Sequence, residues 1–123
     1  MRLKEAIELF DSLNVNTLDR EIKQKWISDL DMQVNGDIHM AHRCMGDPDF
    51  HGYPMDADQE TELLVPAPYD EVYIHYMRMK WANLMQEDAN YNRAANQYNS
   101  FYLGYADWVN RTHMPKPTRL KIV

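Results

Sequence analysis

The chain has 123 residues, of which 45% are hydrophobic and 26% are charged, and its formal net charge is −6. This composition suits one globular domain and is not typical of a disordered chain. No apolar run approaches the ~20 residues that span a bilayer, so no membrane partner is expected. The single cysteine, Cys44, excludes an internal disulfide and is typical of a protein that folds in a reducing cytosol.

The charge is distributed unevenly along the chain. Residues 1–68 contain 6 Lys/Arg and 14 Asp/Glu, whereas residues 69–123 contain 7 Lys/Arg and 5 Asp/Glu. Such an acidic chain is a poor general binder of nucleic acid, because phosphate contacts need clustered cations. One stretch is acidic without any Lys or Arg, and its acids are Asp47, Asp49, Asp56, Asp58, Glu60 and Glu62. The asymmetry suggests two surfaces with different roles.

Hydrophobic spacing predicts two helices in the first part of the chain. Residues 2–12 form a short amphipathic helix with Leu3, Ile7 and Phe10 on one face. A longer helix is predicted from about 17 to about 40, with Asn16 or Thr17 as its N-cap. Its apolar stripe, in steps of four, consists of Leu18, Ile22, Trp26, Ile27, Leu30, Val34 and Ile38.

A long acidic loop is predicted over residues 44–67. The segment has no helical period and is interrupted by Gly46, Pro48, Gly52, Pro54 and Pro66. A short strand is expected at Glu62–Val65. Loops of this length in a compact domain tend to be functional or disordered.

The second half of the chain predicts a helical hairpin. A helix from about 68 to about 86 begins at Pro68, and Asp70 and Glu71 favour its first turn. A short polar corner at 86–88 leads to a helix that ends near Arg111. The seam of that second helix repeats every three to four residues, as in a coiled coil, through Tyr91, Ala94, Ala95, Tyr98, Phe101, Tyr102, Tyr105, Trp108, Val109 and Thr112. So short a corner favours an antiparallel hairpin.

The predicted fold class is therefore all-α. We expect a small helical bundle with a long C-terminal antiparallel hairpin, the acidic loop 44–67 and an extended basic tail. The domain is predicted to span residues 1–114 and the tail residues 115–123, because Pro115 and Pro117 cannot continue the helix.

Two weak metal motifs occur near the loop. His39, His42, Cys44 and His51 lack the second ligand pair of a usual zinc motif. Residues 47–58 imitate an EF-hand loop, but a His replaces one ligand, an Asp replaces the final Glu, and Pro54 interrupts the loop. There is no glycine-rich phosphate loop and no local catalytic motif. We therefore predict no metal, no cofactor and no enzymatic activity.

Aromatic side chains are the candidates for core and interface packing. They are Trp26, Tyr73, Tyr76, Trp81, Tyr91, Tyr98, Phe101, Tyr105 and Trp108. Because they occupy more than one face of the predicted hairpin, one narrow core cannot hide them all. Tyr, Trp and Met are enriched at protein interfaces, which favours an assembly subunit over an isolated monomer.

Three stretches together resemble a known family. They are KQKWISDLD at 23–31, ELLVPAPYDEVYIHYM at 62–77, and NRAANQYNSFY with WVNRTHMPK within 92–116. In this order the chain resembles the head–tail connector proteins of phages and prophages, also called head-completion or adaptor proteins. The resemblance covers about residues 3–114 and consists of packing and capping motifs.

The resemblance implies a structural virion protein that is all-helical and forms a ring, usually twelvefold. Such a ring docks beneath the portal after genome packaging and carries the stopper or tail, so the protein would lie in the virion neck after assembly in the host cytoplasm. The C-terminal extension of the family reaches the portal or a neighbouring subunit. The matching residues here are Arg111, Lys116, Arg119, Leu120, Lys121, Ile122 and Val123.

The charge pattern suggests a role for the acidic loop within such a ring. Packaged DNA must pass through the ring without specific binding, and a channel lined by the carboxylates of residues 47–62 would repel its phosphates. A solvated loop explains the same charge run equally well. The alternative function is a small intracellular helical regulator or binding module that dimerises through the 91–112 seam. An enzyme with a metal at His39, His42 and Cys44 has less support.

Overall fold

The computed structural model describes residues 1–116, and its secondary structure there consists of helices joined by irregular segments, which confirms the all-α class. Its elements are α1 (Leu3–Leu13), α2 (Arg20–Asp37), the short 3-10 helices η1 (His39–Ala41) and η2 (Tyr69–Glu71), α3 (Val72–Leu84) and α4 (Asp88–Thr112). Across this described part of the chain, no helix has an apolar stretch sufficient to traverse a bilayer.

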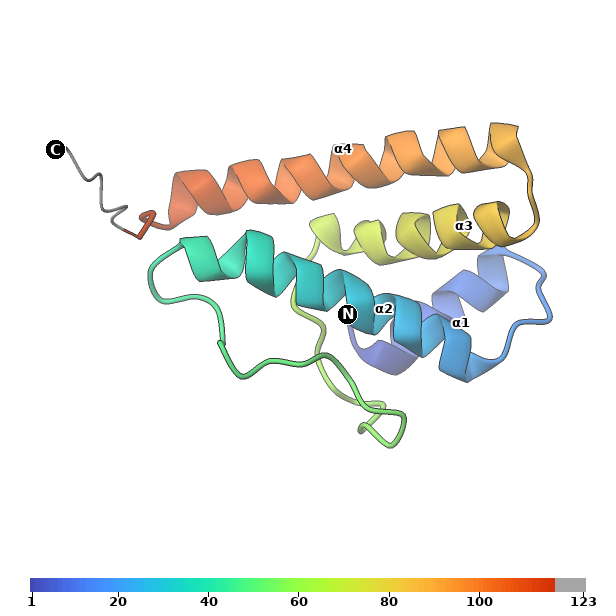
Figure 1. Cartoon of the computed structure of the whole chain (residues 1–123), viewed down its shortest axis with the longest axis horizontal. Helices are drawn as coiled ribbons and strands as arrows, with labels where there is room; N and C mark the ends of the chain where they lie inside the picture. Colours follow the sequence, from blue (N-terminus) through green and yellow to red (C-terminus); the bar gives the residue numbers. More distant parts are fainter. Residues whose placement is uncertain (117–123) are drawn as a thin grey trace, which may run out of the picture.

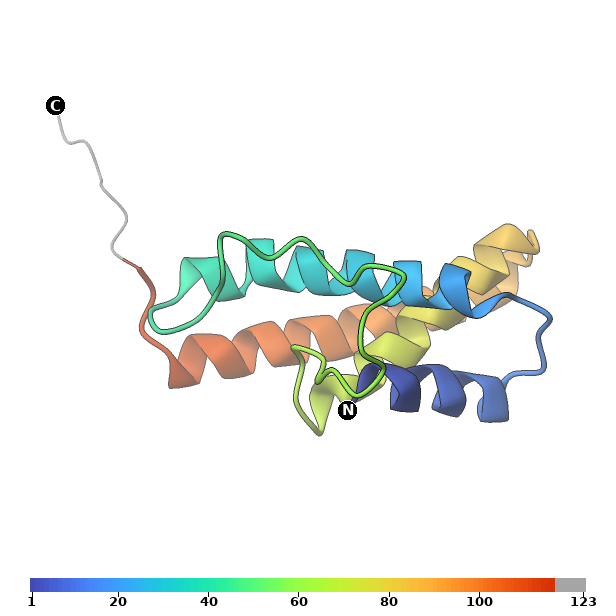
Figure 2. The same ribbon diagram turned by 90° about the horizontal axis from the view of Figure 1, so that it is seen from below.

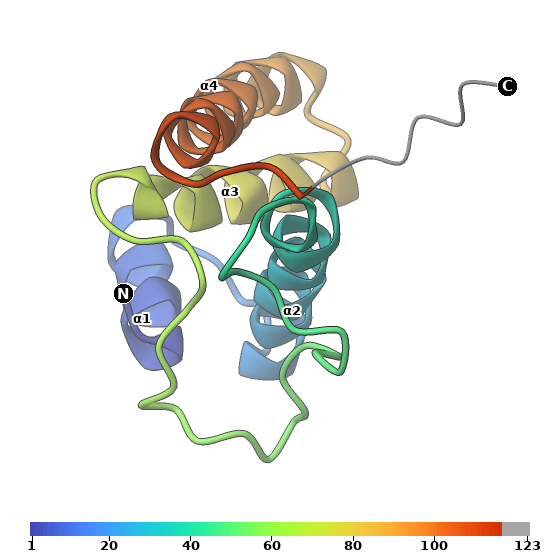
Figure 3. The ribbon, with the colours of Figure 1, turned by 90° about the vertical axis from the view of Figure 1, so that its left-hand side faces the viewer.

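The helices form two layers: α3 and α4 make up one, and α1 and α2 the other (Figure 1). Within this arrangement α3 lies between α4 and the pair of α1 and α2. α3 and α4 run side by side in opposite directions, and the corner at residues 85–87 joins them. α1 and α2 lie side by side below α3, and the long loop after α2 runs beneath them (Figures 2 and 3). α3 therefore contacts all three of the other α-helices.

This central position explains the composition of α3. Its residues from Val72 to Met77 are all buried, because one side of the helix faces α4 and the other faces α1 and α2. Leu3, Ile7 and Phe10 on α1 pack into the same core. Trp81 of α3 meets Phe10 edge-to-face, with ring centroids 6.0 Å apart.

The predicted start of α2 was wrong by about three residues. The helix begins at Arg20, because the side-chain oxygen of Asn16 accepts the N–H of Leu18 at 3.1 Å and forms a turn there. The helix also ends at Asp37, and the chain continues through the 3-10 turn η1. Val15 in the connection is 96% exposed.

The strand expected at Glu62–Val65 is absent from the described residues 1–116. The chain there forms only an isolated antiparallel bridge between Glu62 and Arg2. Its alternating Leu63 and Val65 are still buried against the helices, so the apolar pattern reflects packing of an irregular segment. Likewise the residues after Pro68 form the 3-10 helix η2 before α3 starts at Val72.

The predicted aromatic residues differ in burial. Tyr73, Tyr76, Tyr98 and Tyr105 are buried, while Trp26, Trp81, Phe101 and Trp108 are half-buried. Tyr91 is 37% exposed. The rings of Tyr76 and Tyr98 lie 5.3 Å apart between α3 and α4, so much of this aromatic surface holds the two helices together.

Removal of the Tyr98 ring should destabilise the fold strongly. We expect Tyr98→Ala to lower the free energy of unfolding by about 3–5 kcal/mol, because a buried aromatic side chain leaves a cavity. Urea unfolding followed by circular dichroism measures this. Tyr91→Ala on the same helix is the matched control, and its loss should be much smaller. Equal losses for the two variants would contradict the burial of Tyr98.

Candidate functional site

The acidic loop between η1 and η2 runs below α1 and α2 (Figures 1 and 3). Hydrogen bonds attach its earlier part to α2 and its later part to α1. This later part covers the N-terminus of α1. The N–H groups of Leu3 and Lys4 donate to the carbonyl oxygens of Thr61 and Gln59, at 2.9 and 3.0 Å. Since the first N–H groups of a helix have no partner within the helix, the loop supplies the cap that α1 lacks.

Four polar side chains on one face of α2 bind the loop. They are Gln24, Ser28, Asp31 and Asn35, whose spacing of four, three and four residues places them in one stripe. All four are buried. The amide of Gln24 donates to the Pro54 carbonyl at 2.6 Å, and the Ser28 hydroxyl accepts the Tyr53 N–H at 2.8 Å.

Asn35 closes the other end of this stripe. Its amide nitrogen donates to the Asp47 carbonyl at 2.8 Å, and its amide oxygen accepts the Asp47 N–H at 3.0 Å. Gly52 lies between the two attachment points with φ +81°, and a Cβ there would collide with the Ser28 hydroxyl. The loop therefore needs glycine at this close approach to α2.

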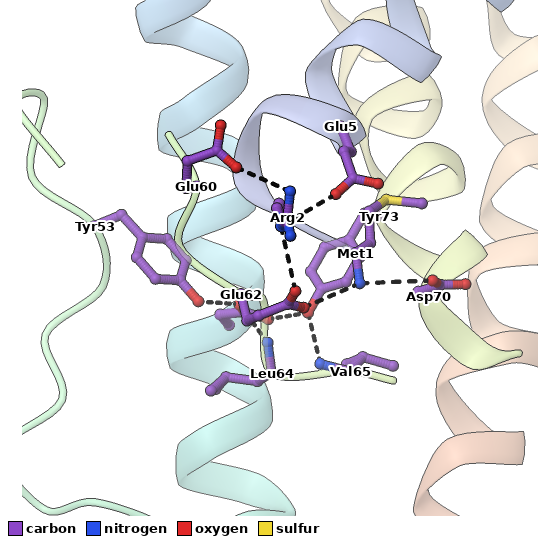
Figure 4. A network of polar contacts seen from close by, with 11 residues as sticks. Met1, Arg2, Glu5, Tyr53, Glu60, Glu62, Leu64, Val65, Asp70 and Tyr73 are labelled. Carbon is purple, nitrogen blue, oxygen red and sulfur yellow. Dashed lines mark hydrogen bonds and ion pairs between the residues drawn. The ribbon is translucent and has the colours of Figure 1, made fainter. Parts of the chain in front are cut away.

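Asp31 is the centre of the attachment, and Figure 4 shows the surrounding residues. The Tyr53 hydroxyl donates to one oxygen of its carboxylate at 2.5 Å, and the Tyr73 hydroxyl donates to the other at 2.6 Å. The Leu64 N–H also donates to the oxygen that Tyr53 binds, at 3.2 Å. Tyr73 additionally accepts the Val65 N–H at 2.8 Å, so one buried group joins α2, α3 and the loop.

Burial determines the electrostatics of this group. Removal from water raises the pKa of Asp31, although the hydrogen bonds from Tyr53 and Tyr73 oppose the shift. Burial also raises the pKa of both tyrosines, and the nearby Asp31 charge raises each further. Both hydroxyls therefore remain protonated donors, and the chemistry of the site is to hold the loop in place.

The six predicted channel acids fall into different environments. Glu60 pairs with Lys4 and with Arg2, the latter at 3.0 Å, and Glu62 lies 3.6 Å from Arg2. The Lys4 hydrogen bond lowers the pKa of Glu60 and raises that of Lys4. Asp47 and Asp58 accept backbone N–H groups two residues ahead, in turns. All six are exposed; they are Asp47, Asp49, Asp56, Asp58, Glu60 and Glu62.

The histidines considered for zinc have other partners. His39 Nε2 lies 2.6 Å from the Tyr105 hydroxyl, and His42 Nε2 lies 2.7 Å from Asn110 Oδ1. Burial lowers the pKa of His39, and the neighbouring His113 and His42 lower it further. Cys44 is exposed. Within residues 1–116 the structure brings together no group of three or more potential metal ligands.

The start of the predicted tail pairs with the segment after η1. The N–H of Lys116 donates to the Ala41 carbonyl at 2.9 Å, and the N–H of Arg43 donates to the Met114 carbonyl at 2.8 Å. Arg111 and Lys116 are exposed. The other predicted tail residues, Arg119, Leu120, Lys121, Ile122 and Val123, lie outside the described part of the chain.

Sequence reasoning missed the polar stripe of α2, although a signal was present. Gln24, Ser28, Asp31 and Asn35 recur at helical spacing just as the apolar stripe does. A helix with an apolar stripe and a separate polar stripe of short side chains can bind a backbone segment on its polar side. No local pattern, however, names the loop as that segment.

These features define a small all-α protein whose long irregular segment is held in one place by buried hydrogen bonds. Comparison of the chain with protein-family models, with curated proteins and with solved structures found no match.

The raised pKa of Asp31 predicts a pH-dependent stability. The folded state binds its proton more tightly than the unfolded chain, so the free energy of unfolding should fall as the pH rises from the ordinary Asp pKa through the raised one. Asp31→Asn removes this titration, and its unfolding free energy should fall less over the same range. Urea unfolding at a series of pH values measures the difference.

Asp37→Asn removes an exposed carboxylate from the same helix and serves as the control. Its unfolding free energy should follow the wild-type pH dependence. Parallel curves for Asp31→Asn and the wild type would contradict the prediction, because they would mean that folding leaves the Asp31 pKa unchanged.

Proposed function

We propose that the chain is a structural virion protein, a subunit of a ring in the phage neck. The ring joins the portal to the stopper or tail-completion protein and lets DNA pass. The protein acts in the virion neck and is present in the host cytoplasm during assembly. The proposal starts from the family resemblance of the stretches at 62–77 and 92–116.

One observation supports the proposal most: these two stretches form the segment that attaches the loop to the core and the helix whose end pairs with residues 41–43. In the first, Leu63 and Val65 are buried and Tyr73 binds Asp31. The second forms most of α4 and then pairs with residues 41–43. The resemblance thus falls on residues that fix a long loop on a helical body, as expected for a building block of an assembly.

The acids of the loop suit a passage for DNA in part. Asp47, Asp49, Asp56 and Asp58 are exposed, and none forms an ion pair with another of the described residues. These four remain the candidates for repelling phosphate from a channel. Glu60 and Glu62 contribute less, because Arg2 and Lys4 offset their charge.

The dimerising regulator has less support, because its seam is already used within one chain. Ala94, Tyr98, Tyr105 and Val109 of the seam are buried, and α4 packs along α3. A second copy would find mainly the outer face of α4, where Leu103 is exposed. We therefore propose no second function.

The proposal predicts a complex with the portal protein encoded by the same genome. We expect the purified protein, mixed with assembled portal, to form a complex whose added mass equals a ring of about twelve subunits, as the resemblance implies. Native mass spectrometry or sedimentation velocity measures that mass. A stable dimer without affinity for the portal would contradict the proposal.

Removal of residues 117–123 should separate tail binding from folding. Cutting after Lys116 keeps its backbone bond to Ala41, so the helical content should be unchanged by circular dichroism. Binding to the portal should be lost, because the cut removes Arg119 and Lys121 from the basic tail. Unchanged portal binding would show that the tail is not the contact, and a loss of helical content would assign it to the fold.

A further inference from the structure

A pocket lies at the end of the molecule where two connections meet. It is lined by residues of the α1–α2 connection, of α3 and of α4, among them Asn14, Arg78, Trp81, Glu87 and Arg93, and has a volume of about 270 Å³. Figures 1 and 2 place the α1–α2 connection and the α3–α4 corner at this same end. The pocket is therefore bounded by three separate segments of the chain.

Two cations without acidic partners mark this pocket. Arg78 donates its Nε–H to the side-chain oxygen of Asn14 at 3.2 Å. Over residues 1–116 neither Arg78 nor Arg93 forms an ion pair. The one carboxylate of the lining, Glu87, accepts a hydrogen bond from Asn90 at 2.7 Å. Two guanidinium groups against one carboxylate leave an excess of positive charge in a protein whose net charge is negative.

Apolar side chains flank this pocket in both connections. Leu13 and Val15 on either side of Asn14 are exposed, as are Leu84 and Met85 at the α3–α4 corner. The buried indole N–H of Trp81 has no hydrogen-bond partner among the described residues. Exposed aliphatic groups around arginine and tryptophan are typical of a protein–protein contact.

The same chain carries the opposite charge on another face. Residues 54–58 form a turn of the acidic loop, which we call the loop tip, closed by the Ala57 N–H that donates to the Pro54 carbonyl at 2.9 Å. In this turn Met55 is 48% exposed, and Asp56 and Asp58 are exposed without an ion pair in residues 1–116. The side-chain amide of Gln24 donates to the Pro54 carbonyl, so the first residue of the loop tip is fixed to α2. The loop lies below α1 and α2, whereas the α3–α4 corner lies at the end of the other layer (Figures 1 and 3).

We propose that the loop tip of a second copy binds this pocket. Asp56 and Asp58 supply the carboxylates for Arg78 and Arg93, and Met55 packs on the exposed apolar side chains beside them. The two surfaces lie on different faces of one chain, so the contact is head-to-tail and can propagate from copy to copy. This inference rests on the proposed function, because it names the contact between neighbouring subunits of the ring.

A charge swap tests the contact. Arg93→Glu and Asp56→Lys should each weaken self-association at low salt at least tenfold, since each opposes like charges across the contact. An equimolar mixture of the two variants should restore it, because every pocket then meets a loop of opposite charge. Sedimentation equilibrium measures the association constant. The matched control pair Arg43→Glu and Asp37→Lys changes exposed charges elsewhere and should leave the constant within twofold.

A disulfide trap provides a second readout for a weak contact. In a Cys44→Ser background, Asp56→Cys combined with Asn90→Cys places one thiol on the loop tip and one at the pocket. We expect oxidation to give a ladder of oligomers on a non-reducing gel, whereas each single variant can give no species beyond a dimer. Absence of a ladder together with a monomeric wild type would overturn the proposal, as would charge reversals that leave the association constant unchanged.

The tests of the two proposals fail separately. A charge swap that restores self-association without any portal complex would keep this contact and reject the neck function. A portal complex of ring mass that Arg93→Glu and Asp56→Lys leave unaffected would keep the neck function and reject this contact.

Discussion

Asp31 places a carboxyl group in the interior of the protein, and the attachment of the long loop depends on how that group is hydrogen-bonded. Burial of an ionised carboxylate costs several kcal/mol unless hydrogen bonds compensate. Here Tyr53 of the loop, Tyr73 of α3 and the Leu64 N–H provide three donors. Because these donors come from parts of the chain that are distant in sequence, the carboxylate is fully satisfied only when α2, α3 and the loop are assembled together. A polar group thereby makes the arrangement of an irregular segment specific, which apolar burial alone does less well.

The same constraint explains why α2 differs from the other helices. One face carries Ile27, Leu30 and Val34 into the core, whereas the other buries the polar stripe of Gln24, Ser28, Asp31 and Asn35. The loop in turn stabilises α1, because carbonyl groups of the loop accept hydrogen bonds from the otherwise free N–H groups of the first turn of α1. A loop without strands in the described residues is thus attached at its beginning, middle and end by side-chain and backbone hydrogen bonds.

Periodicity in the sequence predicted the helices better than it predicted their ends or the loop. The spacing of Leu3, Ile7 and Phe10 predicted α1, and the repeat at 91–112 predicted a helix that the structure ends at Thr112. The start of α2 was missed because Asn16, predicted as the N-cap of the helix, instead forms a turn with Leu18 before it. Asn is common both at helix N-caps and in such turns, so its presence does not distinguish them. The attachment of the loop was missed for a different reason. Most of its bonds run from side chains to backbone carbonyl and N–H groups, which every residue carries, so no residue pattern identifies the partner. The spacing of the polar residues on α2 indicates a polar face. Only the structure shows that the loop is the segment that covers this face.

The structure also refines the meaning of the acidic half of the chain. Sequence counts treat the carboxylates alike, whereas the fold buries Asp31, pairs Glu60 with Lys4 and Arg2, and leaves Asp56 exposed at the tip of the loop. The negative field outside the protein therefore comes more from the four loop aspartates that are unpaired among the described residues than from Glu60 and Glu62, whose charge Arg2 and Lys4 offset. Exposed charge on a turn that is fixed to α2 is well placed to direct association with a cationic surface, and exposed pairs of this kind weaken with added salt. Apolar groups such as Val15, which is 96% exposed beside the pocket, would then supply affinity that salt does not screen. An interface built from both parts should assemble rapidly through charge and persist through apolar contact.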